Sequence, residues 1–199
     1  KIKEFVMYYF FPYYTFDLEE TLYYFLSGRY EFHNKGIDVF IRSLGELNAI
    51  LKRENSKKTI VAFLWVPANI RGIKRELLEI RTQYQDVRDT VIDELEYVKD
   101  QLITDVVAQR KITDSDLLSA GTLLELKRKV MKFKKNGVPP LSTHDLYNEE
   151  ADAILNACKS AGLGNAAEDS VKVVFYPTYL TGADGLLDLT YYESMQGSH

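Results

Sequence analysis

The chain has 199 residues, with 25 Lys and Arg, 29 Asp and Glu, a formal net charge of -4 and 46% hydrophobic residues. This composition is typical of a globular protein with one sizeable core, and it excludes a disordered chain. The mildly acidic balance disfavours nucleic acid as a partner, and no apolar run approaches the roughly 20 residues that cross a membrane. The single cysteine, Cys158, excludes an internal disulfide and favours a reducing, cytoplasmic location.

The first half of the chain predicts a strand, a helix and a second strand. Residues 1–14 are aromatic without a clear period, so we expect an entry segment or linker there. An apolar run at about residues 21–26 predicts a strand buried on both faces, and another predicts a strand at about residues 59–66, before Pro67. Between them, apolar residues at helical spacing predict a helix from about Gly36 to Arg53.

The loop between the first strand and this helix carries two cations, Arg29 and Lys35. In an open α/β sheet such a loop lies at the carboxyl edge, and the following helix points its partly positive N-terminus at a bound ligand. The pattern therefore predicts an anion site, most simply for phosphate. The alternative is that both side chains are solvated surface cations.

Two long helical patterns follow Pro67. The first runs over about residues 74–111, and its apolar stripe includes Val91 and Leu95. The second runs over about residues 116–136, where Asp114 or Ser115 is the expected cap, and these residues are expected to face the first helix: Leu117, Leu123, Leu126, Val130 and Phe133. We predict an antiparallel helical hairpin that projects from the sheet.

The end of the chain predicts a return to the core. Ser142 or Thr143 is expected to open a helix that passes through Leu146 and Ala157, and residues 171–175 predict a third buried strand. The loops after the three strands should lie side by side at one edge of the sheet. Tyr176 and Tyr179, in the loop after the third strand, are candidate contacts for a nucleoside, and the alternative is that they are core or rim tyrosines.

Four segments resemble the animal and fungal type of glycogen synthase. They are GRYEF-x-NKG-x-DVF at residues 28–40, TIVAFLWVP at 59–67, Pro139-Pro140 with Thr143-His144, and VKVVFYPTYL at 171–180. The last segment departs from the family pattern, which reads F-H-P-E-F-L where this chain has Phe175-Tyr176-Pro177-Thr178-Tyr179-Leu180. The resemblance implies one Rossmann-like half of a GT-B fold, the two-domain arrangement of many glycosyltransferases, with an inserted hairpin.

The resemblance also implies an activity. The parent enzyme would transfer glucose, with retention, from UDP-glucose or ADP-glucose to the non-reducing end of an α-1,4-glucan. Arg29 and Lys35 would stabilise the diphosphate leaving group, with Gly28, Asn34 and Tyr176 as further substrate contacts and with neither a metal nor a cofactor. The relatives' amino-terminal domain and acidic E-x7-E segment are not within these residues, so we expect this chain alone to be inactive.

The expected organisation has three parts and a short tail. Residues 1–68 and 139–193 would form the Rossmann-like domain, and residues 69–138 the helical insert, through which a homo-oligomer would assemble. The chain starts at Lys1, and Gly197-Ser198-His199 resembles the start of an expression tag, so residues 194–199 are expected to be a tag or linker remnant of an excised fragment. Two alternatives remain open: an interaction module built on the hairpin, or another GT-B enzyme such as a phosphorylase.

Overall fold

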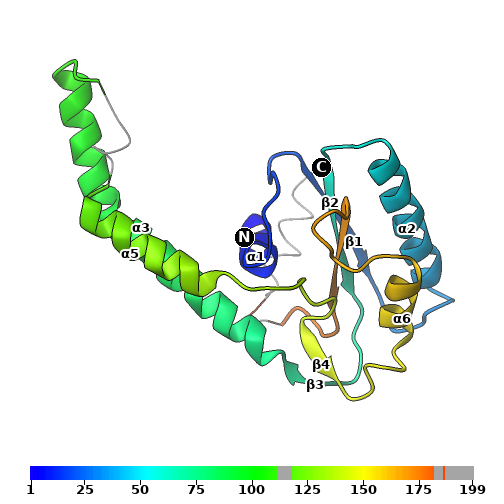
Figure 1. Cartoon of the computed structure of the whole chain (residues 1–199). Coiled ribbons are helices and arrows are strands. Elements are labelled where there is room, and N and C mark those ends of the chain that lie inside the picture. Colours follow the sequence, from blue (N-terminus) through cyan, green and yellow to red (C-terminus); the bar gives the residue numbers. More distant parts are fainter. Residues whose placement is uncertain (112–117, 182–185, 187–199) are drawn as a thin grey trace.

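A computed structural model describes residues 1–111, 118–181 and 186. Within these residues it is an α/β structure with five helices and a parallel sheet of three strands (Figure 1), as predicted. The elements in chain order are α1 (Ile2–Phe10), β1 (Thr21–Ser27), α2 (Ile37–Arg53), β2 (Thr59–Trp65), β3 (Ile70–Ile73), α3 (Arg75–Val107), α5 (Ala120–Phe133), β4 (His144–Leu146), α6 (Ala153–Ser160) and β5 (Val171–Tyr176). The expected tag remnant at residues 194–199 lies outside the described residues.

The register of the sheet brings the ends of its three strands together. The strand order is β1-β2-β5, and both pairs are parallel. Ser27 lies opposite Trp65, and Trp65 lies opposite Tyr176. Because each of these is the last residue of its strand, the three following loops start from one row at the carboxyl edge.

Helices cover both faces of the sheet (Figure 1). Phe63 of β2 belongs to an apolar cluster on the face that α1 and α3 cover, and its ring centre is 5.7 Å from that of Phe5 in α1. Leu64 belongs to a second cluster, with side chains of α2 and α6. Every residue of β2 is buried, as expected for a central parallel strand.

The amino-terminal segment is a helix, so the linker expected at residues 1–14 is a wrong prediction. Five of the nine residues of α1 are buried, among them Phe5, Tyr9 and Phe10. α1 has nine residues, fewer than the roughly 11 to 18 over which a helical period can be recognised, so its pattern did not predict a helix. The Tyr9 hydroxyl donates a hydrogen bond of 2.7 Å to the carbonyl of Pro140, which connects α1 to the segment before β4.

The prediction that β1 is buried on both faces is also wrong for the described residues. Leu22 is 46% exposed and Tyr24 is 38% exposed, whereas Tyr23 and Phe25 pack against the core. β1 is the edge of the three-stranded sheet, so its side chains alternate between the core and the surface.

The segment expected to be a helix from Ser142 or Thr143 instead forms β4, which pairs antiparallel with β3. The helix starts later, at α6. Its N-cap is Asp152, whose Oδ1 accepts a 2.9 Å hydrogen bond from the amide of Leu155. The sequence reading missed this cap and so began the helix about ten residues too early.

Helix α3 is 33 residues long, or about 50 Å, and α5 lies beside it (Figure 1). Lys129 of α5 donates to Asp86 at 2.9 Å and to Thr90 of α3, and the rings of Phe133 and Tyr84 are 6.2 Å apart. The side chain of Ser119 caps α5 through the amide of Thr122; the expected cap, Asp114 or Ser115, and the inward residue Leu117 lie outside the described residues.

In the predicted apolar stripe of α3, Leu77 and Ile80 are buried, Val87, Val98 and Leu102 are half-buried, and other members are exposed. Val91 is 40% exposed and Leu95 is 53% exposed, and on α5 Val130 is 39% exposed. The contact between the two helices thus combines the ion pair of Lys129 with the rings of Phe133 and Tyr84, and several apolar side chains are left on the surface.

The close approach of α2 and α6 gives a testable prediction. A Cβ on Gly45 would lie 2.7 Å from the carbonyl oxygen of Ala161, so Gly45→Ala should force the helices apart and lower the free energy of unfolding by about 1–3 kcal/mol. Gly121→Ala is the matched helical control, because its Cβ would meet only the Ser119 Oγ at 3.6 Å, and it should add up to about 1 kcal/mol. Urea unfolding measures both; a stabilised Gly45→Ala variant would contradict this packing.

Candidate functional site

A cavity of 290 Å³ lies at the carboxyl edge of the sheet. Its lining residues come from the ends of all three strands: Ser27, Gly28, Arg29, Trp65, Pro67, Thr178 and Tyr179. The prediction that these three loops lie together is therefore confirmed. Ligands of open α/β sheets bind in this position.

Arg29 is the one charged residue in the lining, and a second cation lies close to it. A Cβ placed on Gly28 would be 4.0 Å from the Lys35 Cγ, so the stem of Lys35 passes beside the glycine that precedes Arg29. Both cations are exposed, and neither forms an ion pair with another described residue. Two unneutralised charges beside one hollow can bind an anion.

The turn between β1 and α2 holds these cations through backbone hydrogen bonds. The amide of Lys35 donates to the carbonyl of Glu31 at 2.9 Å, and Gly36 has a φ of 66°, a left-handed conformation that glycine adopts without strain. Asn34 is exposed on this turn and does not line the cavity.

The N-terminus of α2 is less available to a ligand than the sequence indicated. The amides of Ile37 and Asp38 both donate to the carbonyl of Phe32, at 3.1 and 3.3 Å. The Asp38 carboxylate is itself in the first turn of α2, and a 2.9 Å hydrogen bond from His33 holds its pKa below the usual value. Anion binding here would thus depend on the side chains of Arg29 and Lys35 rather than on the helix.

The two tyrosines after the third strand have different environments. Tyr176 is 0% exposed and packs edge-on against His144, with ring centres 5.4 Å apart, so it belongs to the core and does not line the cavity. Tyr179 is 69% exposed and lines it. Of the two, Tyr179 is the ring that can contact a ligand here.

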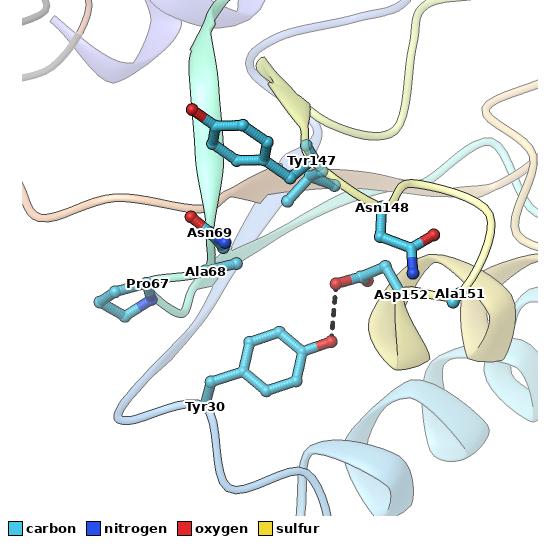
Figure 2. Close-up of a pocket in the computed structure, with 9 residues that line it drawn as sticks. Tyr30, Pro67, Ala68, Asn69, Tyr147, Asn148, Ala151 and Asp152 are labelled. Atoms are coloured by element: carbon cyan, nitrogen blue, oxygen red, sulfur yellow. Dashed lines mark hydrogen bonds between the residues drawn. The ribbon is translucent and has the colours of Figure 1, made fainter.

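A second hollow, of 440 Å³, adjoins the first at Pro67 (Figure 2). It lies between the loop after β1, the loop after β2 and the start of α6. The Tyr30 hydroxyl donates to Asp152 Oδ2 at 2.7 Å across it. Burial, and then this hydrogen bond, raises the pKa of Tyr30, so the hydroxyl keeps its proton in neutral solution.

Sequence reasoning missed this second hollow because its walls are distant in the sequence. Tyr30 and Asp152 are 122 positions apart, and the helix that Asp152 caps was expected to start elsewhere. The polar residues that line it, Asn69, Asn148, Asp152 and Tyr30, form no short sequence motif. Only the position of Asn69, just after a buried strand, indicated that it would lie at this edge.

The remaining candidate groups have structural environments. Burial raises the pKa of Cys158 to about 12, which is the environment of an apolar filler and not of a nucleophile. His144 is 1% exposed, and its Nδ1 lies 2.8 Å from the Thr143 hydroxyl. Within the described residues, no three His, Cys, Asp or Glu side chains gather as a metal site would need, and no helix is long and apolar enough to span a membrane.

Comparison with known proteins supports the resemblance seen in the sequence. The chain is 37% identical to a glycogen [starch] synthase of Neurospora crassa, 37% identical to one of Dictyostelium discoideum and 34% identical to the human liver enzyme. Each match covers the whole chain but only 29%, 23% and 28% of the respective relative, so the chain spans about a quarter of their length. The model of the glycogen synthase family matches residues 1–199, and the chain belongs to this family.

Proposed function

We propose that this chain is the diphosphate-binding part of a retaining glucosyltransferase. The parent protein would transfer glucose from UDP-glucose or ADP-glucose to the non-reducing end of an α-1,4-glucan. The observation that carries this proposal is the cavity at the carboxyl edge, with Arg29 in its lining and Lys35 beside Gly28. The family membership of the whole chain supports the same reaction.

The chemistry explains why two cations are needed. When the bond between glucose and the diphosphate breaks, negative charge grows on the phosphate oxygens, and a cation that is already in place stabilises the transition state more than the ground state. The planar guanidinium of Arg29 would bind two phosphate oxygens, and Lys35 would add a compact charge. With these two groups, the proposed step uses neither a metal nor another cofactor.

Other parts of the proposal concern residues and location. Gly28 would let the phosphates approach the backbone, and Asn34 would contact the donor from the turn. Of the two tyrosines expected to contact the nucleoside, the exposed Tyr179 would do so and the buried Tyr176 would not. The opposite wall of the cleft would come from another domain, so the isolated chain should not transfer glucose. We place the parent protein in the cytoplasm because glucan and nucleotide sugar would meet there.

The nucleotide site can be tested by calorimetry with UDP, UDP-glucose and ADP-glucose. Arg29→Ala and Lys35→Ala should each weaken binding of UDP by about 10- to 100-fold, since a charge-assisted hydrogen bond contributes about 1.5–3 kcal/mol. Arg42→Ala, which removes an exposed cation of α2 away from the cavity, should leave binding unchanged. Equal affinity of all three variants would contradict the proposal, and a preference for UDP-glucose or ADP-glucose would identify the donor.

A second function is favoured by the exposed apolar side chains of α3. Ile92 is 51% exposed, Leu95 is 53% exposed and Ile103 is 56% exposed, and such surfaces mark association sites. We propose that α3 and α5 form an antiparallel hairpin, as their contacts through Lys129 and Phe133 favour, and that this hairpin assembles a homo-oligomer.

Self-association can be tested by light scattering. Leu95→Glu combined with Leu102→Glu should convert an oligomer into a monomer, because a buried carboxylate in an apolar contact is costly. Thr82→Glu adds a charge at an exposed position of the same helix and should leave the oligomer intact. A wild-type chain that is already monomeric would show that the two helices are insufficient for assembly.

A further inference from the structure

The second hollow, between Tyr30 and Asp152, is not part of the proposed diphosphate-binding site. With 440 Å³ it is larger than the Arg29 cavity, and its size is within the range of small-molecule sites. The two hollows share Pro67, and Arg29 and Tyr30 are neighbours in the chain. A ligand that fills the second hollow would therefore lie beside the diphosphate.

One wall of this hollow is a fixed carboxylate. Asp152 is 9% exposed; its Oδ2 accepts from the Tyr30 hydroxyl at 2.7 Å and its Oδ1 accepts from the amide of Leu155 at 2.9 Å. These two bonds hold the group in one orientation. Each carboxylate oxygen has a second acceptor position, so the group can still accept a hydrogen bond from a hydroxyl.

The opposite side offers amides and an aromatic ring. Asn69 and Asn148 are exposed, and neither side-chain amide forms a hydrogen bond with another described residue. Each amide can therefore both donate to and accept from a ligand. Tyr147 is 59% exposed; the Arg71 guanidinium lies 5.3 Å from its ring centre, and the ring provides an apolar surface at the rim.

The charge of this hollow differs from that of its neighbour. No lysine or arginine is among its lining residues, and their one carboxylate is that of Asp152, whereas the charged residue in the lining of the first cavity is Arg29. A phosphate here would meet the Asp152 carboxylate, and the cation beside the hollow, Arg71, lies over the Tyr147 ring. A neutral ligand with many hydroxyl groups and a flat apolar face would satisfy both the amides and the ring.

We propose that this hollow binds a neutral glucosyl ring, with Asn69, Asn148 and Asp152 as hydrogen-bond partners and Tyr147 as the apolar platform. This inference rests on the proposed function, which supplies two sources of such a ring: a unit of the α-1,4-glucan and the sugar of the donor. The geometry makes Tyr147 and Asn148 the residues to change, because both are exposed and α6 does not depend on them.

The test is a calorimetric titration of the chain with maltohexaose, UDP-glucose and UDP. Tyr147→Ala and Asn148→Ala should each lower the affinity for one of the two sugar ligands by about tenfold, which is the effect of losing one or two contacts. Neither variant should change the affinity for UDP. Tyr147→Phe should retain binding because the ring remains. Weaker maltohexaose binding identifies the glucan as the source of the ring, and weaker UDP-glucose binding identifies the donor.

Two controls separate this inference from the function on which it rests. Tyr97→Ala removes a ring of α3 that is about as exposed as Tyr147, at 54%, and should leave the binding of all three ligands unchanged. Arg29→Ala should weaken the binding of UDP but not the binding of maltohexaose. If Tyr147→Ala and Asn148→Ala bind both sugars as the wild type does, or if the wild type binds neither sugar, the inference is wrong, whereas the proposed function fails only if Arg29→Ala leaves UDP binding intact.

Discussion

The parallel register of three strands is the constraint on which the candidate site depends. Ser27, Trp65 and Tyr176 lie in one row, and each strand ends there. A shift of one residue in either pair would turn every side chain of a strand to the opposite face, so the apolar clusters on the two faces fix the register. The cavity follows from this row, because the next residues of each strand must turn away from the sheet at the same edge.

The two hollows at this edge have complementary chemistry. One has an arginine in its lining and a lysine at its side, and the other has a carboxylate, two amides and an exposed tyrosine ring. Pro67, just after the buried central strand β2, lines both of them. A nucleotide sugar has the same division, since an anionic diphosphate is joined to a neutral ring. The arrangement is thus consistent with a site that holds the diphosphate and a sugar side by side.

The sequence allowed prediction of the sheet and of the cations because their signals are local. Apolar runs that stop at Gly28, Pro67 and Pro177 identified the three strands, and parallel strands place their following loops together. The turn that carries Arg29 and Lys35 could be predicted too, because both cations lie in one short segment between a strand and a helix. The membership in a family with known motifs added the expected reaction, which these local signals alone did not contain.

Other features depended on contacts that no local pattern contains. Helix α1 is too short to show a clear helical period, and β1 is half-exposed because it is the edge of the described sheet. The pairing of β3 with β4 replaced part of an expected helix, and the contact between Tyr30 and Asp152 joins residues far apart in the sequence. Tertiary packing decided each of these outcomes against the local pattern.

The central claim is that the carboxyl edge, with its two cations, is where a nucleoside diphosphate binds. The most direct measurement is a map of backbone amide chemical shifts of the chain during a titration with UDP. We expect the largest changes at Gly28, Arg29, Lys35, Thr178 and Tyr179. Changes confined to α3 and α5, or spread evenly over the surface, would contradict it.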